Sequence, residues 1–406
     1  MTSSAKELDN VYDISKDRKA IGSKWIVKIK YKSSGEIDRY KARLVAQRFG
    51  QKERIDYDET FSPVVKMVTV RCLLNVVVSN SWPIYQLDVN NVFLYGDLVE
   101  TVYMKPPKWY FSSKDKVCRL KKSLYGLKQA PRQWNAKLTS TLIENGFSQS
   151  KSDYSLYTKS DKDVFLALLV YVDDITIIGN NVFEIEKFKV YLKSKFMIKD
   201  LGKLKYFLGI EIIDTSKGIC LNQMKYVLNL LSKYDMLACK PTKTPLMSKL
   251  IISNEATDND PILDNITDYQ KFENSYCQEL CKKQNTLSKS STKAEYRALA
   301  SVTSEVIWIL NFLKDLKIDN LLHVSLHCDS NSAIKIAVNP VFHERTNHLK
   351  IDLHFVREIF LIGVIKTVKV DSANQIANIL NKGLDTLQHK FFVEKLGVYN
   401  IYQVET

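Results

Sequence analysis

The chain has 406 residues, of which 45% are hydrophobic and 26% are charged. These values are ordinary for a globular protein of two or three domains, and they exclude a wholly disordered or collagen-like chain. The longest uninterrupted apolar run, VFLALLVYV at residues 164–172, is too short for a membrane-spanning helix, which needs about 20 residues.

The first residues show no apolar segment of a secretory signal, and none of the seven cysteines forms a CxxC pair. These features fit a reducing compartment. We therefore expect a cytoplasmic or nuclear protein without a membrane partner. The sequence gives no indication of an oligomeric state.

The basic charge is concentrated in the first part of the chain. Residues 1–250 contain 42 Lys and Arg against 26 Asp and Glu, whereas residues 251–406 contain 17 against 19. This asymmetry predicts that the first part contacts a polyanion, with nucleic acid as the first candidate. An anionic membrane surface is the second candidate, but we find no basic amphipathic helix to support it.

The first predicted elements are a β-hairpin, a helix and a strand. Residues 24–49 contain two runs rich in Val, Ile and Tyr around a Ser-Ser-Gly turn, which is typical of a hairpin. Residues 66–79 have helical spacing of apolar side chains, and residues 84–89 form a short strand with Asp88 near its end. The hairpin carries basic residues on both arms, namely Lys28, Lys30, Lys32, Arg39, Lys41 and Arg43.

Residues 105–137 contain ten Lys or Arg, one acid and five interleaved Trp, Tyr and Phe residues. Such a stretch suits phosphate contact combined with base stacking. It equally suits a solvated loop whose aromatic side chains enter the core. The stretch alone does not decide between these interpretations.

Residues 164–178 contain two apolar β runs separated by Asp173 and Asp174, which predicts a tight hairpin with both acids at its tip. An Asp-Asp turn is common without any function. Here, however, the fully apolar arms indicate that the tip rises from a buried sheet. Three aspartates on neighbouring β elements can supply the oxygen ligands that pairs of Mg²⁺ ions require in phosphoryl transfer.

Further elements follow in order. We expect a helix at 182–196, a strand pair at 205–213 and 217–222, and a helix at 223–236. Polar residues then indicate a linker. Beyond it we expect helices at 293–316, 331–338, 352–361 and 374–381, with strands at 322–328 and 363–370.

Several long motifs occur together in this chain. They are KWIVKIKYKSSGEIDRYKARLVAQRF (24–49), DYDETFSPVVK (56–66), QLDVNNVFLYGDLVETVYMKPP (86–107), RLKKSLYGLKQAPRQW (119–134), YVDDITIIG (171–179), LGKLKYFLGIEI (201–212), SKSSTKAEYRAL (288–299) and NPVFHERTNHLKIDLHFVREIF (339–360). In this order they resemble the polymerase part of copia-type LTR retrotransposon Pol polyproteins. The resemblance extends along nearly the whole chain.

The resemblance implies an α+β fold. A right-hand reverse transcriptase (fingers, palm and partial thumb) would occupy residues 1–250. A truncated connection at 251–276 would lead to an incomplete, degenerate RNase H-like α/β domain at 277–406. Deoxynucleoside triphosphates and an RNA or DNA template-primer would be the partners, and two Mg²⁺ ions, with Mn²⁺ as an alternative, the cofactors.

The resemblance also implies roles for single residues. Asp88, Asp173 and Asp174 would be the catalytic, metal-holding carboxylates, and Phe93 would exclude a ribose 2′-OH, although a core Phe is the alternative. Gln129 would contact the incoming nucleotide, while Lys30, Lys41 and Arg43 would meet its triphosphate. Residues 207–212 would grip the primer.

The RNase H portion departs from the family pattern. Glu295 and Asp329 match two of its four carboxylates, and Glu295 lies on an apolar helical stripe with Leu299, where burial of its charge would require a partner. The early strand with the first aspartate is absent, and Asn378 stands where the family has its last aspartate. We therefore expect RNase H activity to be lost from a truncated copy or polyprotein fragment.

Two further hypotheses remain beside the polymerase. The chain could be a catalytically dead remnant that binds nucleic acid through its basic first part. It could also be an unstable product, because missing RNase H strands would leave a sheet edge and apolar surface exposed.

Overall fold

The computed structural model describes residues 11–13, 19–32, 34–107, 116–215, 218–240, 242, 244, 290–319, 321, 323–338, 350–380 and 382–399. The chain divides into two compact units. The first holds the residues up to Val227 together with Ile309–Asp319, and the second holds Leu228–Trp308 and the residues from Asn320 onward. The expected linker at 251–276 lies outside the described residues.

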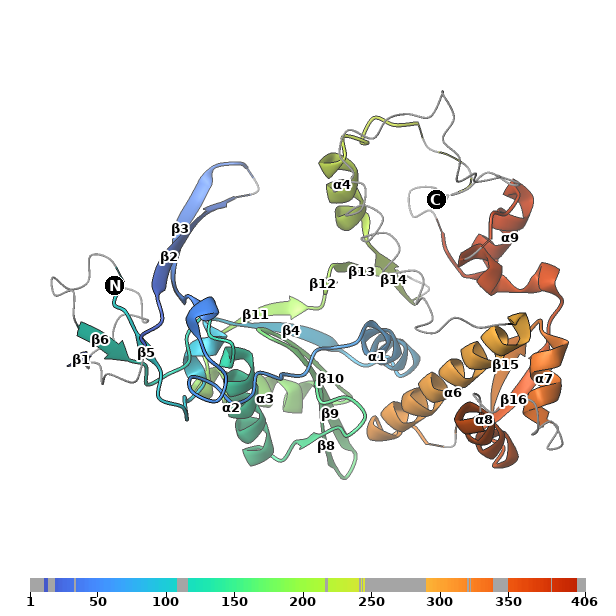
Figure 1. Cartoon of the computed structure of the whole chain (residues 1–406), viewed down its shortest axis with the longest axis horizontal. Helices are drawn as coiled ribbons and strands as arrows, with labels where there is room; N and C mark the ends of the chain where they lie inside the picture. Colours follow the sequence, from blue (N-terminus) through green and yellow to red (C-terminus); the bar gives the residue numbers. More distant parts are fainter. Residues whose placement is uncertain are drawn as a thin grey trace. The chain divides into compact units, whose positions relative to one another are not determined.

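The centre of the first unit is an antiparallel sheet of six strands in the order β11-β4-β10-β9-β8-β7 (Figure 1). Its strands are β4 (Ile84–Val89), β7 (Ser148–Gln149), β8 (Leu156–Asp161), β9 (Val164–Tyr171), β10 (Asp174–Gly179) and β11 (Ile198–Lys203).

The inner strands β9 and β10 of this sheet are buried on both faces. On β9, Leu166, Leu168 and Val170 enter a core that includes helices α2 (Ala130–Glu144) and α3 (Val182–Lys195). The alternate residues of β9 enter a second core with helix α1 (Met67–Ser79). Because successive side chains of a strand point to opposite faces, a strand buried on both faces has an unbroken apolar sequence, as β9 does.

Smaller sheets complete the first unit. A third core joins the base of the β2–β3 hairpin to a sheet in the order β1-β6-β5, and another sheet has the order β12-β13-β14. The elements are β1 (Val11–Asp13), β2 (Ser23–Tyr31), β3 (Ile37–Ala46), η2 (Arg48–Gly50), η3 (Val92–Tyr95), β5 (Tyr103–Met104), β6 (Lys116–Arg119), β12 (Tyr206–Phe207), β13 (Ile210–Thr215) and β14 (Gly218–Asn222). Helix α4 (Met224–Lys233) follows, and its residues from Leu228 onward are grouped with the second unit.

The second unit has its own core, in which Tyr296, Leu326 and Val356 are buried. Its described strands, β15 and β16, form a parallel pair. The elements are α6 (Ser291–Asp315), whose last turns are grouped with the first unit, β15 (Val324–Cys328), α7 (Asn331–Val338), α8 (Lys350–Leu361), β16 (Ile365–Lys369), η5 (Ser372–Asn374), η6 (Ile376–Leu380) and α9 (Thr386–Lys395). Among the described helices of the whole chain, none is long and apolar enough to cross a membrane.

Most predicted elements are confirmed within a few residues, but three predictions were wrong in detail. The strand pair at 205–213 and 217–222 is a three-stranded sheet, because a tight turn at Leu208 and Gly209 divides its first arm. The last predicted helix is the short 3₁₀ segment η6, and α9 beyond it was missed. The acidic hairpin has only Val172 and Asp173 in its loop, since Asp174 pairs with Tyr171 as the first residue of β10.

Gly126 allows the segment before α2 to pack against the base of β3. Its φ is +92°, and an added Cβ would lie 2.2 Å from the Ala46 carbonyl oxygen and 2.6 Å from Val45 Cγ1. The backbone is fixed there, since the Ala46 amide donates to the Tyr125 carbonyl at 2.8 Å. A side chain at this position would therefore push the hairpin away from Tyr125.

We predict that Gly126→Ala lowers the free energy of unfolding by about 2–4 kcal/mol, from backbone strain at positive φ together with overpacking. Gly35→Ala is the matched control, because Gly35 also has a positive φ of +85° but no atom within 4 Å of the added Cβ. Urea unfolding of both variants measures the difference. Equal losses would contradict the assigned role of the Ala46 contact.

Candidate active site

The strand register brings two of the three predicted carboxylates together. Asp174, at the start of β10, pairs directly with Asp88 near the end of β4. The third, Asp173, lies in the loop before β10, and its carbonyl oxygen accepts a hydrogen bond from the Val89 amide at 2.9 Å. The predicted placement of these aspartates on neighbouring β elements agrees with the pairing of β4 and β10, while their role as metal ligands stays a prediction.

Strand alternation places Asp88 and Asp174 on the sheet face opposite α2 and α3. The neighbours Leu87, Val89 and Ile175 point into the core that contains those helices. The two aspartates therefore lie on the other face, where the Gln86 Nε2 amide donates to Asp174 Oδ1 at 3.1 Å.

The carboxylates repel one another. Burial raises the pKa of Asp88, and the nearby Asp173 raises it further, while Lys41, Lys199 and Arg43 lower it. Burial likewise raises the pKa of Asp174; the hydrogen bond from Gln86 opposes this shift, and Asp173 and Asp88 add to it. Clustered carboxylate oxygens suit a hard divalent cation such as Mg²⁺ or Mn²⁺.

The β2–β3 hairpin has one basic face and one apolar face. Ile26 pairs with Arg43, Lys28 with Lys41, and Lys30 with Arg39, so these cations share one face. The opposite face carries Trp25, Val27, Ile29, Tyr31, Tyr40, Ala42 and Leu44.

The basic face of the hairpin acts on the carboxylates. The pKa of Asp88 responds to both Lys41 and Arg43. Burial lowers the pKa of Lys41, as do Arg43, Lys30 and Arg39, while Asp88 raises it. The predicted triphosphate contacts Lys30, Lys41 and Arg43 therefore gather on one surface close to the predicted metal ligands.

An aromatic pair connects the hairpin to the end of β4. Phe93 of η3 meets Tyr125 edge to face with ring centroids 4.8 Å apart, and the Arg43 guanidinium lies 4.7 Å from the Tyr125 centroid. Burial raises the pKa of Tyr125. Phe93 is half-buried, and both its predicted role at the ribose and its alternative as a core residue remain open. Tyr125 had no assigned role, although its motif LYGLKQAP was identified.

Gln129 lies apart from this surface. It is fully buried, its Oε1 accepts from Gln51 Nε2 at 2.9 Å, and its Nε2 donates to the Asp56 carbonyl at 2.8 Å. Contact with a nucleotide remains a prediction, and it would require this amide network to open.

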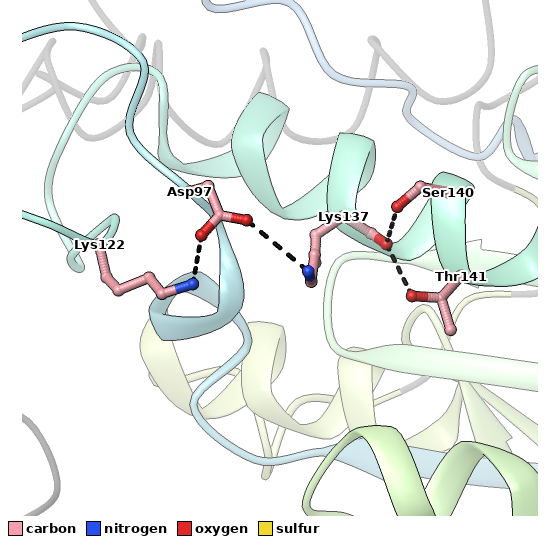
Figure 2. Close-up of polar contacts among 5 residues, drawn as sticks. All are labelled: Asp97, Lys122, Lys137, Ser140 and Thr141. Carbon is pink, nitrogen blue, oxygen red and sulfur yellow. Dashed lines mark hydrogen bonds and ion pairs between the residues drawn. The ribbon is translucent and has the colours of Figure 1, made fainter.

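Asp97 ties the segment after η3 to α2 (Figure 2). Its carboxylate pairs with Lys122 and, at 3.7 Å, with Lys137. The hydroxyl groups of Ser140 and Thr141 donate to the Lys137 carbonyl at 2.9 and 3.0 Å. The hydrogen bond from Lys122 holds the pKa of Asp97 below its ordinary value, as an ion pair does. These contacts fix the chain just after η3, the segment that carries Phe93, relative to α2.

The predicted primer-gripping residues 207–212 form the β12–β13 hairpin, in which Phe207 pairs with Ile210. Phe207 is buried, and its ring centroid lies 6.5 Å from that of Tyr171, the residue that ends β9. The hairpin thus packs beside the carboxylate loop. Its contact with a primer stays a prediction.

In the second unit, Glu295 and Asp329 come together with Cys328, with one ligand atom of each within 4.8 Å of the others. Glu295 is exposed, so the prediction of a charge on a buried helical stripe was wrong; the buried side of α6 passes through Tyr296 and Ala300 instead. Asn378 is buried, and its amide donates to the Ser372 carbonyl at 2.7 Å.

These sites lie in a chain with recognisable relatives. A family model described as reverse transcriptase (RNA-dependent DNA polymerase) matches residues 6–248. The chain belongs to the reverse transcriptase family. The match includes the β2–β3, β9–β10 and β12–β13 hairpins and all three aspartates of the candidate site.

The relatives of this reverse transcriptase are polyproteins of transposons. It is 34% identical to the retrovirus-related Pol polyprotein from transposon RE1 of Arabidopsis thaliana, over 94% of this chain and 32% of that protein. It is 30% identical to the retrovirus-related Pol polyprotein from transposon TNT 1-94 of Nicotiana tabacum, over 96% of this chain and 36% of that protein. The resemblance to copia-type Pol polyproteins is confirmed.

The chain spans about a third of the length of these relatives. The alignment with the Arabidopsis polyprotein extends over 472 positions, more than the 406 residues of this chain. That relative therefore has residues within the matched stretch that this reverse transcriptase lacks.

Among solved structures, a foamy viral protease-reverse transcriptase in complex with double-stranded DNA matches with a TM-score of 0.32 and 14% identity. The match covers 77% of this chain and 46% of that one.

The raised pKa of Asp174 predicts an effect of pH on stability. For an acid whose pKa is higher in the folded state, the free energy of unfolding falls as the pH rises through the interval between the unfolded and folded values. Asp174→Asn removes this penalty. We expect the variant to unfold about 2–4 °C higher than the unaltered protein at pH 8 in a metal chelator. The gain should disappear towards pH 3.

The matched control for this measurement is Asp161→Asn, because Asp161 is exposed at the end of β8. Thermal unfolding followed by circular dichroism compares the three proteins. A gain for Asp174→Asn that persists unchanged at pH 3 would show that charge repulsion is not its cause.

Proposed function

We propose that the chain is an RNA-directed DNA polymerase that extends a primer 3′-OH on an RNA or DNA template with deoxynucleoside triphosphates. The observation that carries the proposal is the direct pairing of Asp174 with Asp88, with Asp173 in the adjoining loop. In this proposal the first unit supplies the fingers, palm and partial thumb of a right-hand polymerase.

The carboxylates Asp88, Asp173 and Asp174 would hold two divalent cations. When bound, such cations activate the attacking hydroxyl and stabilise the charge that develops on the leaving phosphate. The electrostatics of the site favour this assignment, because burial and mutual repulsion raise the pKa values of Asp88 and Asp174. A bound cation relieves that repulsion.

The chain's own side chains would then bind and orient the nucleotide. Lys30, Lys41 and Arg43 would neutralise its triphosphate, since ammonium and guanidinium groups bind phosphate oxygens by charge and by hydrogen bonds. Phe93 would lie against the sugar, held in place by its edge-to-face contact with Tyr125. In that position Phe93 would exclude a ribose 2′-OH and so discriminate against ribonucleotides.

The primary test is extension of a labelled primer on RNA and DNA templates in Mg²⁺. We expect the unaltered protein and Asp161→Asn to extend the primer, and Asp173→Asn to lose at least about a hundredfold in rate. Normal incorporation by Asp173→Asn would reject the mechanism. Salt-sensitive template binding without extension by the unaltered protein would favour the catalytically dead remnant instead.

We further propose that the second unit has lost RNase H activity. Glu295 and Asp329 supply two carboxylates, but the Asn378 amide carries no charge and donates to Ser372 within its own segment. If the two carboxylates that the described residues bring together are the whole anionic set, they are too few to hold the cations of a two-metal site.

The test is release of labelled RNA fragments from an RNA–DNA hybrid in Mg²⁺ or Mn²⁺. We expect the unaltered protein to match Glu295→Gln/Asp329→Asn, with both at the background of a protein-free sample. Cleavage that the double substitution abolishes would show that the second unit retains a working site.

A further inference from the structure

The loop that carries Asp173 contains an unfavourable backbone conformation. Val172 has a φ of +53°. In this left-handed region the Cβ of an L-residue crowds its own backbone, and a β-branched side chain such as valine is a clear outlier there. Such a conformation persists only where the surrounding structure over-determines it. The contacts of the loop should therefore show what holds it.

One contact comes from α2, 38 residues earlier in the chain. The Trp134 indole Nε1–H donates to the Val172 carbonyl oxygen at 2.7 Å. That carbonyl belongs to the peptide group between Val172 and Asp173, so this bond fixes the plane of the peptide that enters Asp173. The Asp173 carbonyl on the other side accepts from the Val89 amide. The main chain of Asp173 is thus held from both sides.

The donor is itself rigid. Trp134 is 2% exposed, and its ring packs against Phe196 and Tyr95 with centroids 5.1 and 5.9 Å away. The Tyr95 ring in turn lies 5.0 Å from that of Phe196, and its hydroxyl accepts from the Met197 amide at 2.7 Å. The indole N–H therefore has a fixed direction, set by α2, η3 and the start of β11.

We propose that Trp134 is a positioning residue for the polymerase, whose indole N–H holds Val172 at positive φ and thereby sets the position of the Asp173 carboxylate beside Asp88. This inference rests on the proposed function, because it assigns a role within the same site. Trp134 touches no reacting atom. Its effect passes through the backbone of the loop, so the effect must depend on which residue occupies position 172.

That dependence supplies the test. Trp134→Phe keeps an aromatic ring but removes the donor, and Val172→Gly makes positive φ favourable without any donor. The experiment compares Trp134→Phe, Val172→Gly, the double variant and the unaltered protein. Trp82→Phe is the matched control, because Trp82 packs against Phe165 at 5.3 Å in the opposite core and is not part of the site.

Single-nucleotide incorporation on a primed template gives the first readout. We expect Trp134→Phe to lower kcat about tenfold with little change in the KM for the nucleotide, the size expected when one buried hydrogen bond that matters in the transition state is lost. The double variant should return to within about threefold of Val172→Gly alone, since removal of the strain makes the donor unnecessary. Trp82→Phe should retain the unaltered rate.

Hydrogen exchange gives a second readout that needs no activity. We expect the amides of residues 172–174 to exchange at least about tenfold faster in Trp134→Phe than in Trp82→Phe, with the exchange of β8 unchanged. Faster exchange across the whole sheet would mean that Trp134 stabilises the fold without a local role, and would overturn the proposal.

The two readouts separate the failure of this inference from the failure of the polymerase function. If the unaltered protein incorporates no nucleotide, the proposed function fails, and the exchange of residues 172–174 alone decides the role of Trp134. If the protein is active, a Trp134→Phe variant within twofold of the unaltered kcat overturns the inference. A double variant as slow as Trp134→Phe overturns it as well.

Discussion

The pairing of β4 with β10 is the constraint on which the rest of the candidate site depends. It places the carboxylates of Asp88 and Asp174 side by side, an arrangement that costs free energy in the absence of a cation. The sheet can impose this cost because its inner strands are buried on both faces. A shift of the register by one residue would move Leu87 and Ile175 out of their core, and the loss of that burial exceeds the gain from separating two charges.

The neighbouring elements make contacts with the groups that this pairing brings together. The carboxylate loop meets Trp134 from α2, and the basic face of the β2–β3 hairpin acts on Asp88 through Lys41 and Arg43. Gly126 lets the chain pass close to the hairpin base just before α2 begins. One short stretch, from Gly126 to Trp134, therefore contacts both the cationic hairpin and the anionic loop. The favourable free energy of packing in the two apolar cores beside the six-stranded sheet compensates the cost of holding the like-charged Asp88 and Asp174 close together.

The sequence alone could predict what depends on local pattern. The apolar run of β9 and the two arms of the β2–β3 hairpin follow from local composition and turn signals, and the structure has them where we expected them. The Asp-Asp hairpin was also predicted, although only Asp173 of the two acids lies in its loop. Helix α2 also has a periodic apolar side, with Ala130, Trp134, Leu138 and Leu142 buried, but its start was considered only as part of the basic stretch 105–137. The meaning of Trp134 depends on a contact across 38 residues, and the burial of Gln129 depends on Gln51 and Asp56. Periodicity contains no information on such pairings.

In the second unit, too, the local sequence pattern did not predict which side chains are buried. There the local pattern placed Glu295 on an apolar helical stripe, yet the side chain is exposed, because the buried face of α6 is set by which strands it meets. Among the described residues of this unit, the sheet is the β15–β16 pair, and a carboxylate at the margin of the helix face that packs in this core can remain in water. In the part of this unit that the structure describes, Glu295 and Asp329 approach one another beside a two-stranded sheet, whereas a six-stranded sheet aligns Asp88 with Asp174. Charge proximity in the first unit is imposed by a packed core, whereas in the second Glu295 remains exposed to solvent, so the two pairs of carboxylates are brought together by different physical causes.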